Sequence, residues 1–104
     1  MAQENVIRHK GKLLLAEQGY VCWSGAKAMY QSSDIFGIFD VIAAKRNAQN
    51  ELRFIQWTSK SNVSARRKKI RHFFLEHNLF ITSELWGYED GKFTMENIEN
   101  PLLY

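Results

Sequence analysis

The sequence predicts an α/β domain in which two helices flank a mixed β-sheet. One observation is the helical spacing of apolar residues in two segments, and another is a series of short apolar runs separated by polar turns. In chain order these segments give the succession α-β-β-β-α-β-β, which favours a sheet covered by helices. The 104 residues are enough for one domain and too few for two, so a single domain is predicted over 1–104.

The first helix is predicted over residues 2–18. Gly19 follows it and favours the left-handed conformation that often ends a helix. Gly11 weakens the middle of this helix by about 1 kcal/mol relative to alanine. Its predicted apolar stripe consists of Val6, Leu13 and Leu14, with Ile7 and Leu15 beside them.

The second helix is predicted to begin at Ser61 or Asn62, because either side chain can cap a helix, and to end before Asn78. Its predicted apolar stripe consists of Val63, Ile70, Phe73, Phe74 and His77.

Five strands are predicted, over residues 20–24, 36–44, 52–58, 80–88 and 93–98. The second and third strands are joined by the short polar segment 45–51, so they are expected to pair as an antiparallel hairpin. The polar loop 25–34 precedes this hairpin, and the turn 89–92 joins the last two strands.

The distribution of charge along the sequence favours one class of binding partner. The net charge of +3 is small, but a basic cluster concentrates it within the second predicted helix. Such a cluster favours polyanions such as nucleic acid, although an ordinary solvated helix face is the alternative. The cluster consists of Arg66, Arg67, Lys68, Lys69 and Arg71.

Cys22 is a single cysteine within an apolar run, so neither an internal disulfide nor a cysteine zinc site is predicted. The N-terminus lacks the apolar run of a signal peptide, and no stretch is long enough to span a membrane. An intracellular, cytoplasmic and soluble protein is therefore expected.

Asp40 is a charged residue that interrupts an apolar predicted strand, so its presence there requires a chemical explanation. An unpaired buried carboxylate is costly, so a cation, a hydrogen-bond donor or a functional role is required. Strand alternation puts it on one face with Phe36, and Gln56 interrupts the next apolar strand in the same way. Pairing of the two strands would bring Asp40 and Gln56 together. Their oxygens suit Mg²⁺ or Mn²⁺, and the alternative is a buried hydrogen bond or the capping of loop amides.

The two runs GIFDVIA (37–43) and FIQWTSK (54–60) resemble the core of PD-(D/E)XK nucleases, and especially the small archaeal-type Holliday junction resolvases. The resemblance covers most of the chain and implies a restriction-endonuclease-like core. It implies that Asp40 is the metal-binding aspartate and that Gln56 takes the acidic position of the third motif. Thr58 then stands where that motif has lysine, and Glu4 corresponds best to the glutamate on the first helix.

The departure Gln-X-Thr leaves the third motif without its lysine. Lys60 lies two residues further on and is expected on the same face, from which its long side chain could reach back. Asp34 is a candidate further ligand if the strand begins early, and otherwise a loop residue. In the polar loop, Lys27 and Tyr30 are candidate contacts to the nucleic-acid backbone.

The expected function is a metal-dependent endonuclease that hydrolyses DNA phosphodiester bonds. Asp40, Gln56, Thr58 and Lys60 would form the catalytic set, and Asp40, Gln56, Glu4 and Asp34 the metal ligands. The basic cluster, with Lys27 and Asn62, would hold branched or duplex DNA, or RNA. The alternatives are a nuclease-like binding module without catalysis and a protein-interaction subunit. The resemblance also implies a homodimer.

Overall fold

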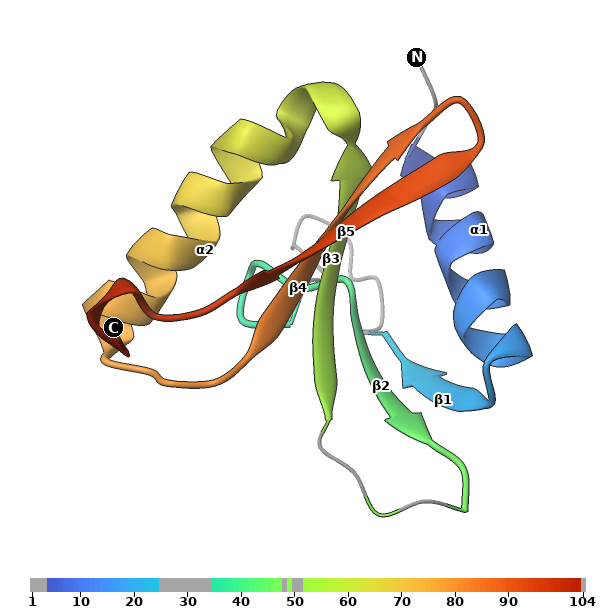
Figure 1. Cartoon of the computed structure of the whole chain (residues 1–104), viewed down its shortest axis with the longest axis horizontal. Coiled ribbons are helices and arrows are strands. Elements are labelled where there is room, and N and C mark those ends of the chain that lie inside the picture. Colours follow the sequence, from blue (N-terminus) through green and yellow to red (C-terminus); the bar gives the residue numbers. More distant parts are fainter. Residues whose placement is uncertain (1–3, 25–34, 48, 50–51, 104) are drawn as a thin grey trace, which may run out of the picture.

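The computed structural model describes residues 4–24, 35–47, 49 and 52–103. It has the predicted α/β architecture, in which a five-stranded mixed sheet lies between two helices (Figure 1). The helices are α1 (Glu4–Glu17) and α2 (Val63–His77), and two 3₁₀ turns are η1 (Lys60–Asn62) and η2 (Pro101–Leu103). The strands are β1 (Tyr20–Trp23), β2 (Val41–Lys45), β3 (Arg53–Ser59), β4 (Ser83–Glu89) and β5 (Lys92–Ile98). In the described part of the chain, no helix combines the length and the apolar character needed to cross a bilayer.

The strands lie in the sheet in the order in which they occur in the chain. Neighbouring strands are antiparallel except β3 and β4, which are parallel and are therefore joined by the crossover helix α2. The predicted hairpin is confirmed, with Val41 opposite Ile55 and Ile42 opposite Phe54.

The two helices cover opposite faces of the sheet. On the α1 face, Ile7 and Leu15 pack with the alternating sheet residues Ile55 and Trp57. On the α2 face, Ile70 and Phe74 belong to a second core with Phe39, Leu85 and Ile98, and Phe54 packs against it. Because residues along a strand alternate between faces, Gln56 and Thr58 point toward the α2 side of β3.

The buried stripe of α1 differs from the predicted one. Its buried residues are Ile7, Gly11 and Leu15, whereas Val6 and Leu13 are 43% and 50% exposed. The indole of Trp57 lies directly against Gly11, where a Cβ would come within 2.6 Å of the Trp57 Cζ2 atom. The closest approach of the helix to the sheet therefore occurs at the glycine, which turns Val6 and Leu13 outward.

The predicted helix stops are confirmed. Gly19 and Asn78 have φ angles of 87° and 55°, in the left-handed region that closes a last helical turn. Asp90 and Gly91 are also left-handed, as a tight turn between the antiparallel strands β4 and β5 requires.

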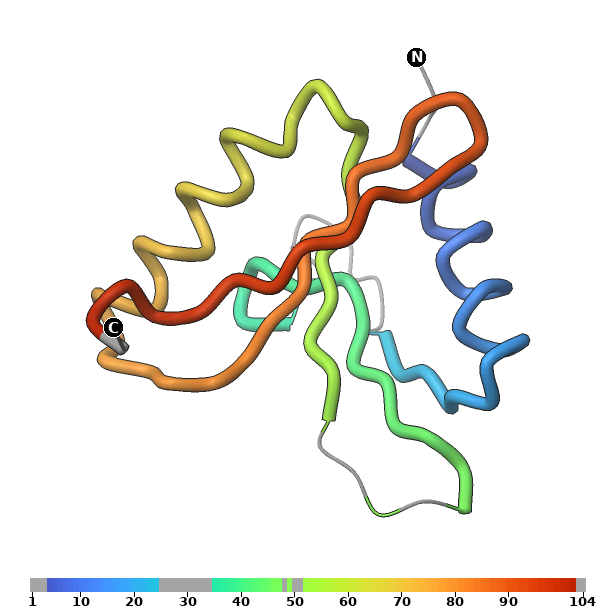
Figure 2. The backbone as a smooth tube through the Cα atoms, in the orientation of Figure 1, coloured from blue at the N-terminus to red at the C-terminus, as the bar shows by residue number. Residues whose placement is uncertain are grey.

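The predicted strand over residues 36–44 is wrong in its first half. Residues 35–39 form a turn in which Ile35 and Phe39 exchange hydrogen bonds of 2.7 and 2.9 Å, and β2 begins only at Val41. The turn depends on left-handed backbone at Phe36 and Gly37, with φ of 57° and 71°. The tube in Figure 2 shows this blue-green turn passing between α2 and β2. Phe36 is therefore not on a strand face but projects from a turn.

Candidate functional site

Asp40 lies immediately before β2 and binds the neighbouring strand with both its backbone and its side chain. Its amide donates to the Ile55 carbonyl at 2.8 Å, and its Oδ2 accepts the Trp57 amide at 2.7 Å. A longer β2 would place Phe39 opposite Trp57, but the Phe39 carbonyl already accepts the Ile35 amide. The Asp40 carboxylate therefore supplies the acceptor that the sheet lacks at this point.

The other carboxylate oxygen of Asp40 binds a residue that the sequence did not single out. Arg8 on α1 donates from Nη1 to Asp40 Oδ1 at 2.9 Å. Asp40 is only 5% exposed and Arg8 is 22% exposed, so the ion pair lies at the edge of the interior. This bond and the Trp57 amide explain how a carboxylate is tolerated here, as the alternative of a buried hydrogen bond anticipated.

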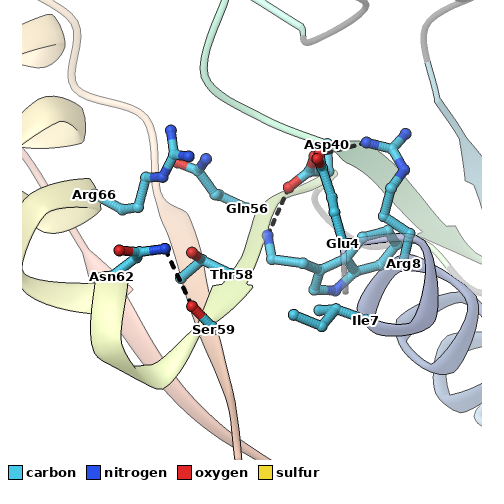
Figure 3. Close-up of a pocket in the computed structure, with 10 residues that line it drawn as sticks. Glu4, Ile7, Arg8, Asp40, Gln56, Thr58, Ser59, Asn62 and Arg66 are labelled. Atoms are coloured by element: carbon cyan, nitrogen blue, oxygen red, sulfur yellow. Dashed lines mark hydrogen bonds and ion pairs between the residues drawn. The ribbon is translucent and has the colours of Figure 1, made fainter. Parts of the chain in front are cut away.

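A polar cavity of about 170 Å³ opens beside this ion pair (Figure 3). It lies where β3 continues beyond the start of β2, so that residues from both helices reach the uncovered edge of β3. The cavity is lined by Glu4, Ile7, Arg8, Asp40, Gln56, Trp57, Thr58, Ser59, Asn62 and Arg66. Six of these were predicted as site residues, and Arg8 and Ser59 were missed. The only signal for Arg8 in the sequence is its position four residues after Glu4, on the same side of a helix.

The start of α2 reaches the cavity because of a glycine in the sheet. Gly87 lies opposite Thr58 in the parallel pair of strands, and a Cβ on it would lie 2.6 Å from the Val63 Cγ2 atom. This close approach brings Asn62 and Arg66 over the end of β3. Asn62 occupies the N-cap position, but its side chain does not cap the helix as predicted. The turn η1 leads directly into α2, and the Val63 amide donates to the Lys60 carbonyl.

Gln56 converges with Asp40 on the cavity, as the sequence predicted. Its side chain is 3% exposed, and its Oε1 atom has no hydrogen-bond partner among the residues that the structure describes. Leaving a buried acceptor unpaired costs about 1–3 kcal/mol, and this carbonyl oxygen can accept a hydrogen bond or bind a cation. Thr58 follows on the same strand face, is 7% exposed, and brings a hydroxyl to the cavity.

Lys60 does not join the site, so its predicted position is wrong. Its Nζ atom lies 4.0 Å from Glu89 Oε1, and both side chains are 57% exposed. The cause is that β3 ends at Ser59, so strand alternation no longer determines where Lys60 points. Asp34, Lys27 and Tyr30 lie outside the described residues.

The basic cluster of α2 divides around the helix, because successive residues are rotated by about 100°. Arg66 lines the cavity and makes no ion pair within the described part of the chain. Arg67 instead binds Glu96 on β5, with 2.6 Å between Nη2 and Oε1, and this hydrogen bond raises the pKa of Arg67. Arg71 lines a separate groove beside residues 97–101, and Lys68 and Lys69 are exposed. The five cations therefore do not form one surface.

No protein-family model, curated protein or solved structure matches the chain. Within residues 4–24, 35–47, 49 and 52–103, no group of three or more His, Cys, Asp and Glu side chains is arranged to hold a metal ion. The oxygens that line the cavity come instead from two carboxylates, two amides and two hydroxyls. Any functional assignment therefore depends on the chemistry of this cavity.

Proposed function

We propose that the chain is a divalent-metal-dependent endonuclease that hydrolyses DNA phosphodiester bonds, of the PD-(D/E)XK type that its motifs resemble. The order of elements and the mixed sheet agree with the restriction-endonuclease-like core that this resemblance implies. The observation that carries the proposal is the carbonyl oxygen of Gln56, which has no partner among the described residues and is buried in the same cavity as Asp40 and Glu4.

The residues of the cavity fit Mg²⁺ or Mn²⁺. These ions prefer oxygen ligands and keep several waters, so a few protein oxygens suffice. Within the described part of the chain Gln56 Oε1 has no hydrogen-bond partner, and the Asp40 carboxylate lies in the same cavity. Glu4 adds an exposed carboxylate at the mouth. When bound, such an ion orients a water, lowers its pKa and offsets the charge of the phosphate.

Other cavity residues suit the phosphate. Arg66 is a cation without an ion pair among the described residues, and it extends from α2 toward Gln56 in Figure 3. The start of α2 adds the positive end of the helix dipole, which favours an anion. We propose that Arg66 takes the part of the missing motif lysine, because Thr58 carries no charge and Lys60 lies elsewhere.

Cleavage of labelled four-way junction and linear duplex DNA, with Mg²⁺ or Mn²⁺, tests the proposal. Wild type is expected to cut in a metal-dependent manner, and Asp40→Asn and Arg66→Ala are expected to cut at least tenfold more slowly. Arg71→Ala is the matched control, since it removes the same charge from another side of α2. Preference for the junction would indicate a resolvase-like enzyme. Equal cutting by wild type and Asp40→Asn would refute the assignment.

A second candidate is a nuclease-like module that binds nucleic acid without cutting it. The Arg8–Asp40 ion pair favours it, because a guanidinium already neutralises the carboxylate that would hold a metal. This candidate predicts no cutting, together with salt-sensitive binding that survives Asp40→Asn and weakens in Arg66→Ala and Lys69→Ala. Binding that is independent of salt would count against it.

We also propose that two copies of the chain associate, because related resolvases must cut two strands of a four-way junction. Two-fold symmetric association is the most common form of protein oligomer. Sedimentation should give the mass of a dimer at micromolar concentration, and a monomer at high concentration would contradict the proposal.

A further inference from the structure

An exposed group of aromatic rings continues from the cavity along α2. Phe36 is 59% exposed, and its ring centroid lies 5.8 Å from that of Phe73 and 6.4 Å from that of Phe54. The ring of His77 lies 4.6 Å from that of Phe73 and is exposed. We call Phe36, Phe54, Phe73 and His77 the ring cluster. It presents the edge of an aromatic layer to solvent.

The ring cluster and the cavity are built from the same three elements. Strand β3 contributes Gln56 to the cavity and, two residues earlier on the same face, Phe54 to the ring cluster. The turn before β2 contributes Asp40 to the cavity and Phe36 to the ring cluster, and it lies between α2 and β2 in Figure 2. The two sites therefore lie along the same three elements.

Helix α2 runs from the cavity to the ring cluster, and Lys69 lies between them on the helix. Its residues Asn62, Arg66, Lys69, Phe73 and His77 fall within an arc of about 80°, because each residue turns the helix by about 100°. Arg66 and Phe73 are seven residues apart, or about 10 Å along the axis. This span corresponds to about three stacked nucleotide steps. One stripe of α2 therefore carries Arg66, the proposed phosphate contact, near its start and the rings of Phe73 and His77 near its end.

The backbone of Phe36 is a separate observation. A bulky residue rarely adopts a φ of 57°, and burial of the ring does not explain it here, because the ring is largely exposed. The left-handed turn instead holds the ring out of the second core while keeping it beside Phe73. Local strain that presents an exposed side chain is typical of functional sites.

We infer that the ring cluster stacks an unpaired nucleobase of the strand whose phosphate lies in the cavity. Every base has a flat aromatic face, so stacking on Phe and His rings selects unpaired nucleotides without selecting their sequence. Base-paired duplex keeps its bases inside the helix and cannot use the rings in this way. The preferred substrate class is therefore nucleic acid with single-stranded or branched segments. This inference rests on the proposed binding of nucleic acid at the cavity.

The test measures binding without divalent metal, by fluorescence anisotropy, to a labelled strand of thymidine nucleotides and to an abasic strand of equal length. Wild type is expected to bind the thymidine strand about tenfold more tightly or better, since stacking is worth that much per base. Phe36→Asn removes the ring while keeping a residue that tolerates the left-handed turn, and it should abolish this preference. Leu75→Ala is the control, since Leu75 is 44% exposed on the opposite side of α2.

The outcomes separate the inference from the proposed function. Equal, salt-sensitive binding of both strands by wild type would overturn the stacking inference and leave phosphate binding at the cavity intact. An unchanged preference in Phe36→Asn, or its loss in Leu75→Ala, would also overturn it. No binding of either strand or of duplex would overturn the proposed function as well. The comparison of the two strands uses wild type alone, so it holds even if a variant fails to fold.

Discussion

The Asp40 carboxylate is predicted to hold the cavity edge of the sheet together. Asp40→Ala removes the acceptor of the buried Trp57 amide, and an unpaired buried amide costs about 1–3 kcal/mol. Arg8 is 22% exposed and can turn toward water, so losing its partner adds only about 0–1 kcal/mol. We therefore expect Asp40→Ala to lower the free energy of unfolding by about 1–4 kcal/mol.

A double-mutant cycle separates the ion pair from the strand contact. Asp40→Asn keeps an oxygen that can accept the Trp57 amide but loses the charge that binds Arg8. Arg8→Ala leaves a nearly buried carboxylate with one fewer donor, which we expect to cost about 1–3 kcal/mol. If the charges interact as the 2.9 Å contact indicates, the double variant should lose about 1–2 kcal/mol less than the sum of the single variants.

Urea denaturation followed by tryptophan fluorescence measures these differences, provided that the dependence on denaturant is the same for all variants. Arg71→Ala is the control, because an exposed arginine away from the ion pair should change stability by less than about 0.5 kcal/mol. Additive effects of Arg8→Ala and Asp40→Asn would show that the ion pair contributes nothing. A loss below about 0.5 kcal/mol for Asp40→Ala would refute the role of the carboxylate in the sheet.

Three further variants test how the site is positioned and what it costs. Gly87→Ala should lower stability by about 1–3 kcal/mol, because its Cβ would lie 2.6 Å from Val63 Cγ2. The clash would also move the start of α2 and so weaken nucleic-acid binding. Thermal unfolding measures the change in stability, and fluorescence anisotropy measures the change in binding. Gly11→Ala introduces a similar clash, with the Trp57 indole, but improves helix propensity by about 1 kcal/mol. We expect the clash to outweigh this gain, so a higher stability in urea denaturation would contradict the close packing. Methionine has a shape similar to that of glutamine and no side-chain oxygen, so Gln56→Met should raise stability by about 0.5–2 kcal/mol. The same variant should abolish metal binding measured by calorimetry. A loss of stability would mean that Gln56 stabilises the core.

The elements and the meeting of Asp40 with Gln56 could be predicted because both depend on local periodicity. Apolar spacing distinguishes helix from strand, and a short polar connection makes two strands pair. Once the strands pair, alternation brings Asp40 and Gln56 to the same place whether or not β2 extends that far. The prediction therefore succeeded although the strand that supported it was partly wrong.

The failures occurred where apolar character does not determine the backbone. The turn at Phe36 and Gly37 lies within a continuous apolar run, so hydrophobicity could not distinguish it from a strand. Lys60 was misplaced because alternation ceases where the strand ends. Arg8 was missed because its partner is 32 residues away, and that proximity arises only when α1 packs on the sheet.

Gln56 and Phe36 each have a feature that disfavours folding and that the packing of the fold does not explain. Gln56 buries an unpartnered oxygen, and Phe36 holds a left-handed backbone that costs about 1–3 kcal/mol for a bulky residue. Asp40 differs from both, because the sheet uses its carboxylate in place of a missing strand acceptor. Variants of Asp40 thus change folding and function together, and their activity is informative only beside a measured stability. Gln56→Met and Phe36→Asn are expected to keep or raise stability. A loss of metal or base binding in these two variants would therefore reflect the site itself rather than damage to the fold.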